Sequence, residues 1–142
     1  MRTNEKTCFV DPSLAVAAFR LSQQKLLGDP ETFEFMFENL VARDVLAYAE
    51  VYHYREAANP GHKESDVDLV VELGDDEYRL IEVELGAHQT DDAEASLLHV
   101  SKKLLAGGAD RPVCMMVISG TVPFAYTTEK GIKVVSLGCL GK

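Results

Sequence analysis

Residues 66–85 have the sequence DVDLVVELGDDEYRLIEVEL, which predicts two β-strands joined by a tight turn. Apolar side chains occupy every second position of the first half: Val67, Leu69, Val71 and Leu73. Such alternation is typical of a strand that turns one face to the core. The three residues 74–76 (GDD) are typical of a hairpin loop, and the alternation resumes after them.

The turn determines which residues of the two strands face each other. Closing the hairpin over residues 74–76 pairs Leu73 with Glu77. The same register places two acidic pairs side by side: Asp68 with Glu82, and Asp66 with Glu84. The apolar side chains, completed by Ile81 and Val83, then share one face, and the four carboxylates converge on the other. A slip of two residues keeps this parity and places Asp68 opposite Glu84.

Carboxylates that face each other across a sheet repel, so this cluster needs an explanation. A divalent cation is one, because Mg²⁺ binds carboxylate oxygens, keeps several waters and supports phosphodiester hydrolysis. A solvated outer face is the simpler one, since acidic side chains belong in water and such strands are common in acidic proteins. The pattern alone favours the solvated face.

The flanking sequence predicts helices and further strands. Asp11-Pro12 and Asp29-Pro30 are typical helix starts, for helices over residues 13–19 and from residue 30 to about Val51. Thr90 is expected to cap a helix that runs to about Ala106. Strands are expected over residues 7–10, 50–55, 113–118, 124–127 and 132–137. From residue 31 the order is α-β-β-β-α-β-β-β, which predicts an α/β (α+β) fold.

Composition limits the class of protein. The chain has 142 residues and a formal net charge of -9, which suits one compact acidic domain. No apolar run is long enough for a membrane span, and three widely spaced cysteines indicate a reducing, cytoplasmic setting. Between Glu64 and Glu94, Arg79 is the only basic residue among 12 acidic ones. This charge counts against phosphate binding there.

Several segments resemble one family. They are VDPSLAVAAF (10–19), FMFENLVARDVLAYAE (35–50), VYHYRE (51–56), SDVDLVVEL (65–73), IEVELG (81–86) and VVSLGCLGK (134–142). In this order they resemble the C-terminal domain of unknown function of bacterial and archaeal AAA-type ATPases, from about residue 6 to residue 141. The resemblance implies a restriction-endonuclease-like fold of the PD-(D/E)XK superfamily, with a central mixed sheet flanked by helices. Residues 29–142 would form that domain, and residues 1–28 an N-terminal extension with a short strand and a helix.

The resemblance also assigns site residues. Asp68 and Glu82 match the metal-binding pair of the nuclease pattern, and Glu38 matches an accessory acidic position. The expected catalytic residues are therefore Asp68, Glu82 and Glu84. Of these, Glu84 departs from the pattern, because it occupies the position at which the pattern requires lysine. Glutamate there reverses the charge that would stabilise the developing anion. Lys102 or Lys103 would have to compensate from the following helix.

Two functions follow as expectations. The first is a degenerate, non-catalytic nuclease-like module that serves an AAA-type ATPase, located upstream in the same protein or on a separate chain. No ATP-binding G-x-x-x-x-G-K-[ST] motif occurs in this chain itself. The second is a Mg²⁺-dependent DNA or RNA endonuclease with a displaced lysine. A homo-oligomer is left open. The aromatic residues Phe35, Tyr48, Tyr52 and Tyr54 could stack on bases, but without interleaved Arg and Lys they are expected to pack against a partner domain.

Overall fold

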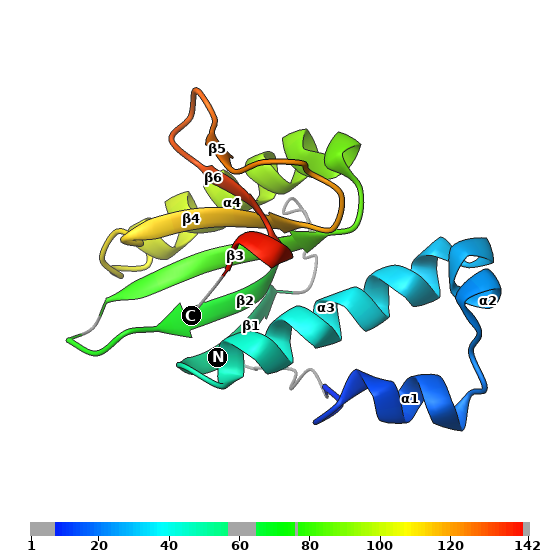
Figure 1. Ribbon diagram of the computed structural model, residues 1–142. Helices are drawn as coiled ribbons and strands as arrows, with labels where there is room; N and C mark the ends of the chain where they lie inside the picture. The colour runs from blue at the N-terminus through cyan, green and yellow to red at the C-terminus, as the bar shows by residue number, and fades with distance from the viewer. Residues whose placement is uncertain (1–7, 57–64, 76, 141–142) are drawn as a thin grey trace.

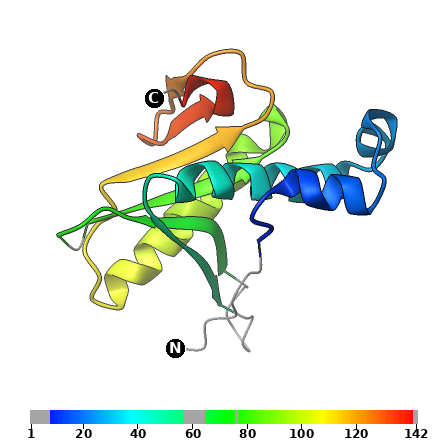
Figure 2. The ribbon, with the colours of Figure 1, turned by 60° about the horizontal axis from the view of Figure 1, so that its bottom comes forward.

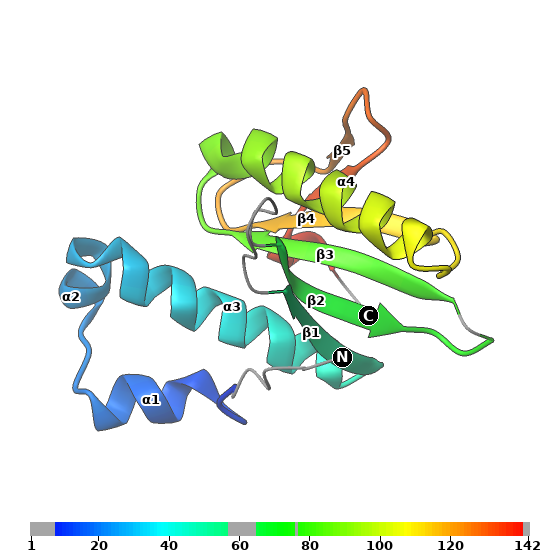
Figure 3. The ribbon, with the colours of Figure 1, turned by 180° about the vertical axis from the view of Figure 1, so that it is seen from behind.

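A computed structural model of the chain describes residues 8–56, 65–75 and 77–140. Its centre is a six-stranded mixed sheet with the strand order β1-β2-β3-β4-β6-β5. The strands are β1 (Glu50–Glu56), β2 (Ser65–Glu72), β3 (Tyr78–Glu84), β4 (Cys114–Ser119), β5 (Tyr126–Thr127) and β6 (Lys133–Ser136). Helices α3 (Pro30–Leu46) and α4 (Thr90–Ala106) cover its two faces, α3 in front in Figure 1 and α4 in front in Figure 3. The predicted α/β class and order of elements are confirmed.

The helix starts follow the predicted capping chemistry. Asp11 accepts a 2.9 Å hydrogen bond from the Ser13 N–H at the start of α1 (Pro12–Ala18). Asp29 accepts one of 3.2 Å from the Thr32 N–H at the start of α3. These bonds satisfy amides that have no partner within the helix. Helix α4 begins at Thr90, so Thr90 is its first residue and not its cap.

Three predictions at the N-terminal side are wrong. Residues 8–10 form no strand, because the Phe9 N–H donates to the Asn39 side chain at 3.0 Å instead of to a neighbouring strand; residue 7 lies outside the described ranges. Helix α3 ends at Leu46, because Val51 already pairs with Val71 in the sheet. An additional helix, α2 (Gln23–Gly28), precedes α3. Figures 1 and 2 show α1 and α2 beside the first half of α3, away from the sheet.

The sheet combines two kinds of pairing. Strands β1, β2 and β3 form an antiparallel meander. Helix α4 then crosses over the sheet, so that β4 lies parallel to β3, and β6 lies parallel to β4. The short β5 pairs antiparallel with β6, after a turn in which Gly131 has a φ of 81°. Two 3₁₀ turns, Ala87–Gln89 and Leu137–Cys139, complete the described elements.

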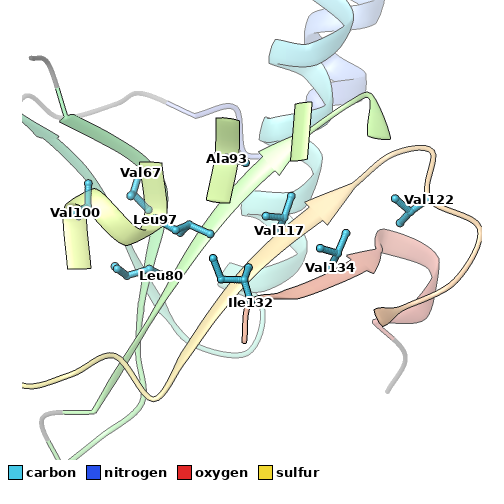
Figure 4. Close-up of a cluster of buried hydrophobic side chains, with 9 residues drawn as sticks. All are labelled: Val67, Leu80, Ala93, Leu97, Val100, Val117, Val122, Ile132 and Val134. Carbon is cyan, nitrogen blue, oxygen red and sulfur yellow. The ribbon is translucent and has the colours of Figure 1, made fainter. Parts of the chain in front are cut away.

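The core has one layer on each side of the sheet. Figure 4 shows the layer under α4, formed by Val67, Leu80, Ala93, Leu97, Val100, Val117, Val122, Ile132 and Val134. The layer under α3 contains Phe37, Val41, Ala42, Leu69, Val71, Ile81, Val83 and Ile118. Both faces of the sheet are therefore buried. The predicted solvated face of the hairpin is wrong for this reason.

A bulge explains why the predicted apolar set divides between the two layers. Tyr52 pairs with Val70 and Tyr54 with Val67, so β2 advances by three residues while β1 advances by two. The extra residue reverses the face to which the following side chains point. Val67 therefore lies under α4, whereas Leu69 lies under α3. Asp68 lies at the bulge, between these two residues.

Within the described ranges, no helix combines the length and the apolarity that crossing a bilayer requires.

Candidate functional site

The hairpin has the predicted register. Leu69 pairs with Ile81, and the Leu73 N–H donates to the Glu77 carbonyl at 2.9 Å. Both pairs belong to the register that places Asp68 opposite Glu82. The alternative, in which β2 slips by two residues, is excluded.

Beyond the Leu69–Ile81 pair, hydrogen bonds to side chains replace the backbone hydrogen bonds between β2 and β3. The Val83 N–H donates to Asp68 Oδ2 at 2.9 Å, and the Asp68 N–H donates to Glu82 Oε2 at 3.4 Å. Each acidic side chain thus accepts from the backbone of the opposite strand. The predicted proximity of Asp68 and Glu82 is confirmed, and its geometric cause is an early end of the backbone pairing.

Glu82 is the most deeply buried acidic side chain of this pair of strands, with 7% of its surface exposed. Burial, reinforced by the neighbouring Asp68 carboxylate, raises the pKa of Glu82 to about 9, against a smaller lowering by the Ser96 hydroxyl of α4. A carboxyl in such surroundings holds a proton at neutral pH, because an isolated buried charge is costly. Glu82 therefore requires either a proton or a cation.

Glu84 meets carboxylates from α3. Burial raises the pKa of Glu84 to about 8, and the charges of Glu34, Asp68 and Glu38 and a hydrogen bond with Glu34 act in the same direction. The Gln89 amide in turn donates to Glu34 Oε1 at 2.8 Å. The structure thus brings five carboxylates to one end of the sheet: Glu34, Glu38, Asp68, Glu82 and Glu84.

Glu34 was not among the predicted site residues. Its spacing from Glu38 is four residues, which places both side chains on the same face of α3. That spacing is the signal available in the sequence. Which strand this face meets depends on how α3 packs, and the sequence pattern does not contain that information.

Asp66 departs from the prediction. The register would place it opposite Glu84, but the pairing has already ended, and β1 pairs Asp66 with Arg55. Its Oδ1 lies 3.1 Å from His53 Nε2, while the other ring nitrogen of His53 lies 3.1 Å from the Asp68 carbonyl oxygen. Asp66 therefore lies beside His53 of β1, whereas Glu84 lies near Glu34 and Glu38 of α3 and near Asp68.

The two lysines considered as replacements differ in their surroundings. Lys103 Nζ lies 2.7 Å from Glu56 Oε2 and 3.4 Å from Ser65 Oγ, so Lys103 is engaged near the start of β2. Lys102 is exposed. The charged groups with the largest effect on the pKa values of Glu82 and Glu84 are the carboxylates of Asp68, Glu34 and Glu38.

A small cavity of about 130 Å³ lies between α3 and the β1–β2 edge. Glu38, Asp68 and His53 line it, together with Cys8. Within the described ranges, no three or more His, Cys, Asp or Glu side chains are grouped as ligands of one metal ion. Mg²⁺ needs fewer protein ligands, because one or two carboxylates suffice when waters complete its shell. Asp68 and Glu82 fit that requirement, and Glu38 lies across the cavity from Asp68.

We compared the chain with protein-family models, curated proteins and solved structures, and none of the three comparisons gave a match. Functional inference therefore depends on the geometry of the acidic site and on the surfaces around it.

Proposed function

We propose that this protein is a degenerate nuclease-like module of the PD-(D/E)XK type that does not cleave nucleic acid and serves an AAA-type ATPase as an accessory domain. One observation carries the proposal. Glu84, in the position of the nuclease lysine, is hydrogen-bonded to Glu34 and lies within the field of Asp68 and Glu38. The ammonium that should stabilise a developing anion is replaced by a carboxyl group, which has no positive charge to offer in either protonation state.

The charge around the site supports the same conclusion. A phosphodiester brings negative charge to the site, and proteins that bind it supply Lys or Arg side chains. Here the charged groups with the largest effect on Glu82 and Glu84 are carboxylates, and the chain as a whole has a net charge of -9. Nucleic acid would be repelled before any chemistry began.

Exposed apolar side chains support a role in assembly. Leu14 of α1, Phe19 directly after it and Leu27 of α2 have exposed fractions of 62%, 64% and 64%. Large apolar side chains exposed on two consecutive helices are candidates for an interaction surface. We assign this N-terminal region to contact with the ATPase module or with a second copy of the chain. The cytoplasm is the proposed location, and the three widely spaced cysteines fit a reducing compartment.

A Mg²⁺-dependent nuclease is the second candidate. The proximity of Asp68 and Glu82 favours it, because a hard cation would stabilise both carboxylates without a shared proton. When bound, Mg²⁺ would lower the pKa of a water ligand and so supply a nucleophile. Asp68 and Glu82 would hold the ion, with Glu38 as an accessory ligand.

The two candidates give different results in one experiment. Isothermal calorimetry with MgCl₂ and MnCl₂ measures ion binding by the wild type and Asp68→Asn. Incubation with supercoiled plasmid, single-stranded DNA and RNA measures cleavage. The non-catalytic module predicts intact substrates with either ion. Cleavage by the wild type that Asp68→Asn abolishes would overturn it, and absence of ion binding would overturn the second candidate.

The accessory role has a separate test. An AAA-type ATPase encoded beside this chain, or fused to it, is purified and mixed with it, and complex formation is followed by analytical ultracentrifugation. Leu14→Ser and Phe19→Ser should weaken the complex, because they remove exposed apolar area. Unchanged affinity in both variants would contradict the assigned surface.

A further inference from the structure

A second cavity lies on the α4 face of the sheet, at the hairpin end. Its volume is about 540 Å³, within the range of about 300–1,000 Å³ found for ligand pockets. Figure 3 shows α4 in front of β3 and β4, while the ribbons of β1 and β2 extend beyond it. Leu104 near the end of α4 and Ala109 after it line the cavity, together with residues of β1, β2 and β3. The smaller cavity, which Glu38 and Asp68 line, shares Tyr52 and His53 with it.

Tyrosine rings form much of the wall of this second cavity, which we call the groove. Tyr52 and Tyr54 come from β1, and Tyr78 comes from β3. Tyr54 and Tyr78 pack against the core layer under α4, together with Leu104, so the floor of the groove is fixed. Tyr52 is 49% exposed and stands at the rim.

Carboxylates lie around the rings. Glu72 and Glu77 line the groove, as does Asp75 of the hairpin turn. The Tyr52 hydroxyl donates to Glu50 Oε2 at 3.0 Å. That bond, with the charges of Glu50 and Glu72, raises the pKa of Tyr52. The Tyr52 end of the groove therefore has a negative potential.

The other end of the groove is closer to neutral. The Tyr54 hydroxyl donates to Glu56 Oε2 at 3.0 Å, and the Lys103 ammonium lies 2.7 Å from the same oxygen. His53, which also lines the groove, has its ring nitrogens at the Asp66 carboxylate and the Asp68 carbonyl. A cationic ligand would therefore be attracted mainly to Tyr52 and Glu72.

We propose that this groove binds an arginine side chain presented by a basic segment of a partner protein. Aromatic faces attract cations, and the planar guanidinium also stacks on rings and pairs with carboxylates through two parallel hydrogen bonds. The combination of Tyr52, Glu72 and an apolar floor supplies all of these interactions. The net charge of -9 favours the approach of a basic partner. This inference stands apart from the nuclease-like site.

The test uses fluorescence anisotropy with a fluorescein-labelled heptapeptide in which arginines alternate with glycines. Binding to the wild-type chain should saturate. The same peptide with citrulline in place of arginine keeps the shape and loses the charge, and its binding should be at least about fivefold weaker. Tyr52→Ala should weaken binding of the arginine peptide to a similar extent, and Glu72→Gln should weaken it about threefold.

Matched variants separate a specific groove from general attraction. Glu129→Gln removes the same charge as Glu72→Gln from an exposed turn outside the groove, and binding should be unchanged. Tyr52→Phe keeps the ring and should keep most of the affinity, and circular dichroism verifies that each variant is folded. The proposal is overturned if binding does not saturate, if the citrulline peptide binds equally well, or if Glu129→Gln has the effect expected of Glu72→Gln.

Discussion

The backbone N–H of Val83 donates a 2.9 Å hydrogen bond to Asp68 Oδ2, just beyond the last backbone pair between β2 and β3. The Asp68 carboxylate thus accepts the hydrogen bond that a backbone carbonyl of β2 would accept in a regular antiparallel pair. Because Asp68 is bound to β3 in this way, it lies close to Glu82, and its charge contributes to the raised pKa of Glu82. The acidic site and the end of the hairpin are therefore one structural feature.

This relationship predicts a difference between two variants of Asp68. Asparagine keeps an oxygen that accepts from Val83, whereas alanine leaves that amide without its partner. We expect Asp68→Ala to have a free energy of unfolding about 1–2 kcal/mol below that of Asp68→Asn, the cost of an unpaired amide. Urea unfolding followed by circular dichroism measures both values. Equal stability of the two variants would show that the hydrogen bond contributes nothing.

The raised pKa of Glu84 predicts how stability depends on pH. An unfolded glutamate loses its proton near its ordinary value of 4.5, whereas folded Glu84 keeps it up to about pH 8. Between these values the folded state binds more protons than the unfolded state, so the free energy of unfolding falls as pH rises. One such carboxyl contributes at most about 1.4 kcal/mol per pH unit. The contribution is complete below pH 4.5 and is lost above pH 8.

Urea unfolding at pH 5, 6, 7, 8 and 9 tests this dependence. Glu84→Gln has no proton to lose, so its stability should fall less over this range than that of the wild type. Glu129→Gln provides a control, because it removes an exposed carboxylate far from the site's two strands. Parallel curves for the wild type and Glu84→Gln would contradict the proposed protonation of Glu84.

The hairpin shows how much of the site could be predicted from the sequence. Alternation of apolar residues and the turn at Gly74, where φ is 61°, determine the register locally, so the proximity of Asp68 and Glu82 was predictable. The bulge opposite His53 was not, because it arises from pairing with β1, and the alternation within β2 and β3 does not determine the register of that pairing. The same limit applies to Glu34, which meets Glu84 only because α3 packs over β3.

Replacing Glu84 with lysine should stabilise the fold. A lysine ammonium beside Glu34, Glu38 and Asp68 would exchange repulsion for attraction. At pH 8 we expect melting temperatures in the order Glu84→Lys, Glu84→Gln, wild type, with Glu84→Lys above the wild type by about 3–5 °C, which corresponds to roughly 1 kcal/mol. Differential scanning calorimetry measures the order. A melting temperature of Glu84→Lys below that of Glu84→Gln would mean that the α3 carboxylates do not face this position.

Gly120 directly follows β4 and packs closely against Leu85, which directly follows β3. Its N–H donates to the Glu84 carbonyl at 2.9 Å, and a Cβ at Gly120 would lie 3.0 Å from the Leu85 carbonyl oxygen and 3.1 Å from Leu85 Cδ1. Backbone held by a hydrogen bond yields poorly to such a contact. We expect Gly120→Ala to lower the free energy of unfolding by about 1–2 kcal/mol, as overpacking does elsewhere.

Gly28→Ala is the matched control for Gly120→Ala. Gly28 is the last residue of α2, and a Cβ there would have no heavy atom within 4 Å. Gly28→Ala should raise the free energy of unfolding by about 0.5–1 kcal/mol, because alanine has less backbone entropy to lose on folding. If the packing at Gly120 is as close as the structure has it, urea unfolding should show changes of opposite sign in the free energy of unfolding of the two variants. A stabilising Gly120→Ala would mean that Leu85 can move away, and the position of Glu84 at the end of β3 would then not be fixed by β4.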